Sequence, residues 1–197
     1  IQEKTQAYKG LLSGKLRFSI VSTGKYIMPY LLSEFSQKHP QLGIQMDVTN
    51  RYKVLQSLEK NEIDFSLMSL LPDNLALDAI SLMPNYLYWV SSQESAQNLA
   101  LIFREEGSAT RIAMEFFLKS KDVDTNNKIE LSSNEAIKQA VMAGLGVSLL
   151  PLIGIKNELL EGRLKIATQE NLPIISTWHL VWLKGKSLSP AAQAYLE

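Results

Sequence analysis

The feature that most constrains the fold is a regular alternation of strand-like and helix-like hydrophobic patterns. Residues 15–21 alternate apolar and polar side chains, as a half-buried strand does. Residues 28–35 instead place apolar side chains three and four positions apart, a spacing that puts them on one face of a helix. Strands at 42–48 and 63–69, with a helix at 51–60 between them, continue the series. This β-α-β-α-β order predicts an α/β fold with a parallel sheet.

The second half of the chain repeats that order after an extended segment, 77–92, that lacks a helical period. The further elements expected are strands at 100–106, 127–132 and 146–151 and helices at 108–120 and 133–144. A last strand-like segment, 175–184, has no partner in the second half, so we expect it to return to the first. The chain is therefore expected to form two lobes joined by two crossing strands, with a cleft between them. Lobe I comprises 15–90 and 175–197, and lobe II comprises 91–174.

Composition narrows the classes of function. Twenty basic and twenty acidic side chains cancel, so the chain lacks the basic surface that binding to nucleic acid or to a membrane requires. The absence of cysteine excludes disulfides, cysteine-ligated zinc and thiol catalysis. No apolar run reaches the roughly 18 residues of a membrane span, and residues 1–16 lack the apolar core of a signal peptide. We interpret residues 1–14 as the end of a linker helix followed by a Gly/Ser linker, and expect another function in a part that precedes them.

Polar residues gather where expected strands end and helices begin, the positions at which open α/β sheets bind ligands. The turn Ser22-Thr23-Gly24 joins the first strand to the first helix. Its hydroxyls either cap that helix or, together with the free N–H groups of a helix start, form an anion site. The same alternatives apply to the other candidates, of which Arg51 alone carries a full charge suited to a carboxylate or phosphate. The predicted ligand-binding residues are Ser22, Thr23, Asn50, Arg51, Ser69, Gly107, Ser108, Thr110 and Ser132.

Motifs for catalysis, metals or cofactors are not found. His39 falls at the expected end of the first helix, where a capping role is favoured, and His179 lies in an apolar strand run, so the two histidines make no metal cluster. No nucleophile elbow, phosphate-binding loop or dinucleotide-binding glycine motif occurs. The aromatic segment 86–89 either stacks on a cofactor or belongs to the core. We predict no enzyme, no metal and no cofactor.

Four segments carry a resemblance to a known family. They are "GKLRFSIVSTGKYIMPYLLSEFSQKHPQLGIQMDV", "TNRYKVLQSLEKNEIDFSLM", "REEGSATR" and "SNEAIKQAVMAGLGVSLLP". In order and spacing they resemble the effector-binding domain of the LysR-type transcriptional regulators, over residues 11–197. The last segment is the most specific, because a helix that ends in Ala143-Gly144-Leu145-Gly146 and leads into an apolar strand closed by Pro151 is typical of that family.

The resemblance implies a fold of the type II periplasmic-binding-protein kind, with two Rossmann-like lobes that sense a small molecule in the cleft between the lobes. In the family the turn at residues 22–24 lines that cleft. Such domains pair as a homodimer or tetramer, and the helices at 51–60 and 133–144 are the expected contact elements. DNA would be bound, in the cytoplasm, only through a winged helix-turn-helix domain that is not part of this sequence.

The expected effector is a small anionic metabolite, and no membrane contact is expected. A solute-binding protein of a transporter with the same fold is the alternative, and an enzyme built on two such lobes is a third. A solute receptor should show a signal or lipid-attachment segment in its precursor, whereas a regulator should show a winged helix-turn-helix upstream. The preceding residues of the gene would therefore discriminate between them.

Overall fold

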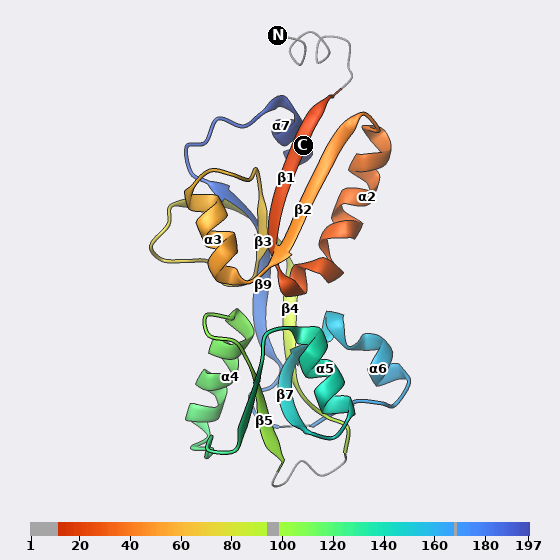
Figure 1. Ribbon diagram of the computed structural model, residues 1–197, viewed down its shortest axis with the longest axis vertical. Helices are drawn as coiled ribbons and strands as arrows, with labels where there is room; N and C mark the ends of the chain where they lie inside the picture. The colour runs from red at the N-terminus through yellow and green to blue at the C-terminus, as the bar shows by residue number, and fades with distance from the viewer. Residues whose placement is uncertain (1–11, 94–98, 168) are drawn as a thin grey trace. The chain divides into compact units, whose positions relative to one another are not determined.

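The fold is described by a computed structural model that covers residues 12–93, 99–167 and 169–197 (Figure 1). Residues 1–11, most of the segment interpreted as a linker, lie outside this part. No helix in these described ranges has both the length and the apolar character needed to cross a membrane.

Two strands, β4 (Leu77–Ser91) and β9 (Ile174–Leu183), carry the chain from one unit to another. The first unit extends to Leu82 and resumes with Trp178–Glu197, and the second is Met83–Thr177. The sequence had placed these boundaries after residues 90 and 174. The first differs most because the extended segment expected at 77–92 forms a single strand of 15 residues, which the boundary divides.

The first unit is built on parallel strands. Its elements are β1 (Gly14–Val21), a 3-10 helix (Ser22–Tyr26), α2 (Met28–Lys38), β2 (Leu42–Thr49), α3 (Arg51–Glu59), β3 (Ser66–Met68) and α7 (Pro190–Leu196). β1 pairs with β2 in parallel, and the parallel bridge Phe18–Phe65 sets β3 beside β1. β3 is antiparallel to β9, which confirms that the last strand-like segment returns to the first half of the chain.

Aromatic rings fill the core of the first unit. Phe18 and Phe65, from neighbouring strands, have ring centroids 5.9 Å apart, and both contact the ring of Tyr195 on α7 at 5.5 and 5.6 Å. Burial raises the pKa of Tyr195 to about 12. On α3, Val54 and Leu58 are buried against the strands, as their spacing predicts.

The second unit has the same order of elements. They are β5 (Ala100–Arg104), α4 (Ala109–Ser120), β6 (Lys128–Leu131), α5 (Asn134–Met142), β7 (Gly146–Pro151), a 3-10 helix (Leu152–Gly154), α6 (Lys156–Leu160) and β8 (Lys165–Ile166). β5 pairs in parallel with both β6 and β7, whereas β4 is antiparallel to β7 and to β8. Both halves of the chain therefore contain the predicted parallel core with an antiparallel strand added.

Helices cover both faces of this second sheet (Figure 1). Along β5, Phe103 packs in a cluster with Met114 of α4, while its neighbour Ile102 packs in another with Ile137 of α5. Successive side chains of a strand point to opposite faces, so the near-continuous apolar run of β5 is explained by burial on both sides. Trp89 belongs to the α4 cluster, 4% exposed, and the partly buried Tyr88 packs against the α5 cluster, which places these two aromatic residues in the core.

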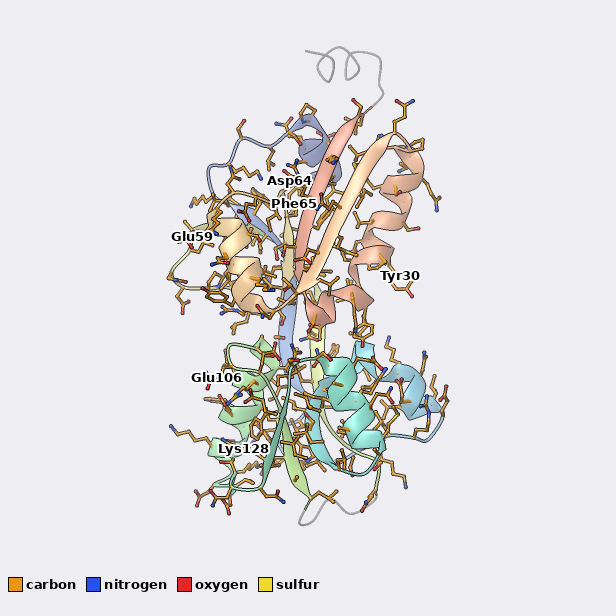
Figure 2. The ribbon with its side chains drawn as sticks, viewed as in Figure 1. Tyr30, Glu59, Asp64, Phe65, Glu106 and Lys128 are labelled. Carbon is orange, nitrogen blue, oxygen red and sulfur yellow. The ribbon has the colours of Figure 1, made fainter. Side chains whose placement is uncertain are left out.

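The apolar stripe of α5, expected to face a partner chain, is used inside its own unit. Ile137 and Val141 are fully buried against the sheet and Ala140 is nearly so, and on α3 the side chains of Val54 and Leu58 are buried likewise. These apolar side chains therefore face their own sheet, and the expectation that the two helices form the contact between subunits stays a prediction. A helix that covers a sheet buries its apolar face against that sheet. Among the larger exposed apolar side chains is Tyr30 of α2, 80% exposed (Figure 2).

Glycines end α5 as the sequence indicates. The N–H of Gly144 donates to the carbonyl of Val141, and that of Leu145 to the carbonyl of Ala140, the hydrogen-bond pair of a Schellman motif. Gly144 has φ +79°, which favours glycine. At Gly146 a Cβ would overlap the carbonyl oxygen of Ala100, so the close approach of β7 to β5 requires glycine there.

Candidate functional site

Strand register brings three predicted residues of the first unit to one edge. β1 and β2 end level, at the pair Val21–Thr49. The bridge Phe18–Phe65 keeps β3 in step with β1, and each of these strands ends at the third residue beyond the bridge. Because the carboxyl ends of parallel strands meet at the same edge of a sheet, the residues that follow them lie close together. These residues are Ser22, Asn50 and Ser69.

The turn after β1 does not cap a helix. A five-residue 3-10 helix, Ser22–Tyr26, follows the strand directly, and α2 begins only at Met28. Neither helix has a side-chain hydrogen bond at its N-terminus, so the capping alternative for Ser22 and Thr23 is wrong. Thr23 is nevertheless only 8% exposed. Its side chain is therefore largely buried without the capping hydrogen bond that threonine commonly makes at a helix start.

Asn50 and Arg51 open α3 with different roles. Asn50 caps the helix, because its Oδ1 accepts a hydrogen bond of 2.9 Å from the N–H of Lys53. Arg51 is partly exposed, but its Nε is buried and has no hydrogen-bond partner among the described residues. His179 of β9, paired with Met68 at the end of β3, has a ring Nδ1 in the same condition. His179 had been placed in an apolar strand from the sequence, with no binding role predicted for it.

The second unit gathers its candidates in the same manner. β5 and β6 end level at Arg104–Leu131, so Ser132 and the segment that follows Arg104 lie at one edge. Ser108, 6% exposed, stands at the N-terminus of α4 without a side-chain capping bond. Thr110 is 9% exposed, and Gly107, at φ +78°, has open space where a Cβ would lie. Ser132 is exposed, and the neighbouring Ser133 caps α5 through a 3.1 Å hydrogen bond from the N–H of Ala136.

Two buried polar residues at this edge were missed from the sequence. Arg104 is 5% exposed and is held by Glu105 through two hydrogen bonds, Nε–Oε2 at 2.7 Å and Nη2–Oε1 at 2.8 Å. Asn134, the first residue of α5, is 4% exposed. A charged pair at a strand end was a usable signal for Arg104. An asparagine at a helix start is usually a solvated residue, so nothing in the sequence indicated that Asn134 is buried.

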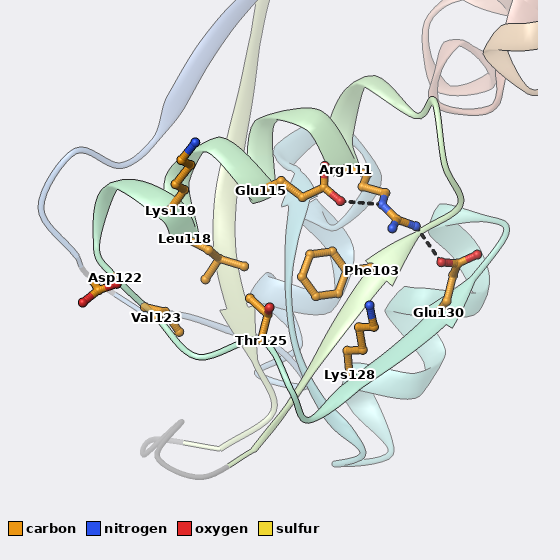
Figure 3. A pocket seen from close by; sticks show the side chains of 10 residues that line it. All are labelled: Phe103, Arg111, Glu115, Leu118, Lys119, Asp122, Val123, Thr125, Lys128 and Glu130. Carbon is orange, nitrogen blue, oxygen red and sulfur yellow. Dashed lines mark hydrogen bonds and ion pairs between the residues drawn. The ribbon is translucent and has the colours of Figure 1, made fainter.

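A pocket of about 350 Å3 lies elsewhere in the second unit, between α4 and the edge strand β6 (Figure 3). Arg111 spans it, bound to Glu115 at 2.7 Å and to Glu130 at 2.6 Å, with Phe103 and Lys128 beside it. The hydrogen bond to Glu115 is the main cause that raises the pKa of Arg111. None of the predicted residues lines this pocket, and its arginine is already neutralised by two carboxylates.

No group of three or more His, Asp or Glu side chains within the described ranges is placed to hold a metal ion. His39 follows the last residue of α2. Its N–H donates to the carbonyl of Phe35, and its ring centroid lies 4.7 Å from that of Phe35, in agreement with the predicted terminal position.

The polar edges of the two units offer hydroxyls, amides and arginines, which suit hydrogen bonding to an oxyanion.

The chain resembles known proteins over nearly its whole length. Residues 9–197 match the family described as LysR substrate binding domain. The RuBisCO operon transcriptional regulator of Allochromatium vinosum is 37% identical, over 100% of this chain and 69% of the relative. The HTH-type transcriptional activator CmpR of Synechocystis is 36% identical, again over 100% of this chain and 69% of the relative. The solved regulatory domain of Synechocystis CcmR in complex with 2-PG is 33% identical, with a TM-score of 0.86, and the match covers 93% of this chain and 94% of that one.

These likenesses confirm the predicted fold class. The molecule is an α/β protein of the type II periplasmic-binding-protein kind, with a Rossmann-like parallel core in each half and two crossover strands. The relatives are transcriptional regulators and not the solute-binding proteins of transporters. The transporter alternative is therefore excluded for this chain.

Proposed function

Because this chain belongs to the family of LysR substrate-binding domains, we propose that it senses a small anionic metabolite. It is the effector-binding domain of a LysR-type transcriptional regulator. One observation carries the proposal for the effector: the CcmR regulatory domain, 33% identical, has been solved with 2-PG (2-phosphoglycolate). That ligand combines a phosphate with a carboxylate. A small phosphorylated acid of this class is the proposed effector.

In the first unit we assign the binding of the anion to the turn after β1 and to its neighbours at the same edge. Ser22 and Thr23 have hydroxyls that cap no helix, so they are available as donors. Arg51 supplies the positive charge, and its buried Nε gains a partner when an oxyanion binds. Ser69 and the amide nitrogen of Asn50 support them. The same oxyanion would thus be met by neutral donors and by one guanidinium.

In the second unit a corresponding set comprises Gly107, Ser108, Thr110 and Ser132. Ser108 and Thr110 are buried at the start of α4, where free backbone N–H groups and the helix dipole favour an anion. Gly107 leaves room for a ligand to approach the backbone. Each set is proposed by itself, and the two can be tested by separate substitutions.

We further propose the setting in which the domain works. The curated relatives named here are longer than this chain, and CmpR is described as an HTH-type activator. We infer that DNA is bound through a separate helix-turn-helix domain, that the regulator acts in the cytoplasm as a homodimer or tetramer, and that the chain catalyses no reaction. Purified chain incubated with 2-PG should accordingly release no phosphate.

Calorimetric titration tests the effector and the turn together. We expect the wild-type chain to bind 2-PG in preference to neutral analogues. Thr23→Val keeps the shape of the side chain but removes the hydroxyl. Loss of one hydrogen bond to a charged group should weaken binding roughly tenfold to a hundredfold.

The matched control is Thr125→Val, an exposed threonine before β6 and away from the carboxyl edge. It should leave the affinity unchanged. A wild-type chain that prefers a neutral ligand would contradict the anionic effector. Unchanged affinity of Thr23→Val for 2-PG would instead remove only the turn from the site.

A further inference from the structure

Asn134 is a buried amide without a partner at the start of a helix. Its side chain is 4% exposed, and neither Nδ2 nor Oδ1 has a hydrogen-bond partner in the described part of the chain. Nearly all buried polar side-chain atoms in folded proteins are hydrogen-bonded. Among the described residues, Asn134 alone has both the donor and the acceptor of one side chain unpaired, whereas Ser19, Arg51, Ser66 and His179 each have one such atom.

The helix does not need this amide for its own cap. Ser133 already fills that role, since its Oγ accepts from the N–H of Ala136 at 3.1 Å. α5 has nine residues, and the N–H groups of its first turn carry a partial positive charge. Asn134 is the first residue of α5, so its side chain starts from the same turn as those N–H groups and tilts toward the helix N-terminus. The unpaired amide and the helix start therefore converge.

The surroundings fix the kind of group that would bind there. Arg104 lies at the same strand edge, but Glu105 occupies its guanidinium with two short hydrogen bonds, so the pair brings no net charge. A ligand group must then be recognised by neutral donors and one acceptor. A phosphate monoester presents acceptor oxygens and, when singly protonated, one O–H donor. A carboxylate presents acceptors alone and would leave Oδ1 unpaired.

We propose that Asn134 binds the phosphoryl group of the effector, with Nδ2 donating to one phosphate oxygen and Oδ1 accepting from the protonated one. This assignment rests on the proposed function, because it takes the effector to be a phosphorylated acid. It adds the residue that reads the phosphate and the helix, α5, on which that phosphate rests. The unpaired amide is then a cost in folding that is retained because ligand binding needs it.

Two measurements on the same variants give effects of opposite sign. Asn134→Leu replaces the amide by an apolar group of similar shape, so the ligand-free chain should melt roughly 2 to 4 °C higher. The same variant should bind 2-PG and inorganic phosphate about tenfold to a hundredfold more weakly, and glycolate, which lacks the phosphate, with unchanged affinity. Asn134→Asp, which cannot donate from either oxygen when ionised, should lose more affinity for 2-PG than Asn134→Leu does.

The matched control is Asn157→Asp, at an exposed asparagine on α6 of the same unit. It should change neither the affinity for 2-PG nor the melting temperature. Unchanged phosphate binding by Asn134→Leu, beside a wild type that binds 2-PG, would overturn this inference and leave the proposed function standing. A wild type that binds none of the three anions would overturn the proposed function. In that case the melting temperature would still test the role of Asn134. A lower melting temperature for Asn134→Leu would show that the amide has a structural role.

Discussion

The two units share a β-α-β-α-β plan but stabilise it with different chemistry. The first surrounds its strands with aromatic rings, Phe18, Phe65 and Tyr195. The second pairs charges along its helices: Lys138 of α5 bonds Glu158 of α6 at 2.7 Å, with both side chains about 90% buried. A comparable pair in the described part of the first unit is Lys186–Asp64, at 3.3 Å.

That difference affects what each unit can offer a ligand. In the second unit the arginines near the strand edge already have carboxylate partners, Arg104 with Glu105 and Arg111 with Glu115 and Glu130. In the first unit Arg51 has a buried nitrogen without a hydrogen-bond partner among the residues that the structure describes. A topology repeated twice therefore gives one edge with an available cation and another with neutral donors. Topology sets where ligands can bind, and local pairing of charges sets how they are recognised.

The largest expected effect is on the buried ion pair of the second unit. Lys138→Met would leave Glu158 buried without its cation and should lower the free energy of unfolding by about 3 to 5 kcal/mol. Lys186→Met in the first unit should cost less, because Asp64 keeps a 2.8 Å hydrogen bond from the N–H of Arg17. Urea unfolding of both variants, followed by circular dichroism at pH 7, gives the two values. A greater loss for Lys186→Met would reverse the comparison.

Acid provides the control for that pair. Burial raises the pKa of Glu158, but the hydrogen bond and charge of Lys138, with a backbone hydrogen bond and the charge of Arg163, outweigh burial and lower it from the ordinary value of 4.5. A carboxyl with a lowered pKa contributes its full stabilisation above the unfolded value and loses it as the pH falls through the folded value. The gap between wild type and Lys138→Met should therefore narrow below pH 4.5. A gap that keeps its size at about pH 2, well below that value, would mean that the lysine stabilises α5 by some other contact.

The next effect comes from the tightest backbone contact. Gly146→Ala places a methyl group over the carbonyl oxygen of Ala100 and 2.8 Å from Cγ1 of Ile102, so β7 must move away from β5. The cost should be about 3 kcal/mol, the upper end for overpacking. Gly24→Ala in the first unit meets only side-chain atoms of Ile20 and Leu67, at 3.3 Å, and should cost about 1 kcal/mol. Thermal unfolding compares them, and equal costs would contradict the rigid spacing of β5 and β7.

Periodicity predicted most of the fold because burial follows it closely. The spacing of Val54 and Leu58 predicted both α3 and its buried face, and the sequence after Val141 predicted a glycine-terminated helix. The pattern could not reveal which surface covers an apolar stripe. The stripe of α5 therefore read as a subunit contact although its own sheet buries it.

The sequence predicted which positions make up the candidate site, but not the role of each residue there. Residues after parallel strands must gather at one edge, so Ser22, Asn50 and Ser69 could be named from order alone. What each residue does depends on its hydrogen bonds. These form only within a few tenths of an ångström, and the local sequence does not reveal which of them form. Thr23 lies in a 3-10 helix that precedes α2, while Asn50 caps α3 directly. The burial of Asn134 depends on packing by segments distant in the sequence, so no local pattern predicts it.

The smallest expected effect compares two matched helix caps. α3 and α5 each have nine residues, and each is capped by one side-chain oxygen, from Asn50 at 2.9 Å and from Ser133 at 3.1 Å. Asn50→Ala and Ser133→Ala should each lower the free energy of unfolding by about 1 kcal/mol. Titration with 2-PG then separates them. Asn50→Ala should also weaken binding, because the amide nitrogen proposed to support the anion is lost, whereas Ser133→Ala should bind as wild type does.

The substitution Asn50→Asp sharpens this last comparison, since aspartate keeps the capping oxygen and removes only the amide nitrogen. Stability should stay near that of wild type, because aspartate caps a helix about as well as asparagine. Affinity for 2-PG should fall, both from the lost donor and from the added negative charge beside an anion. If Asn50→Asp binds 2-PG as well as wild type does, Asn50 is a cap alone, and the first unit would then recognise its ligand through Ser22, Thr23, Arg51 and Ser69 without it.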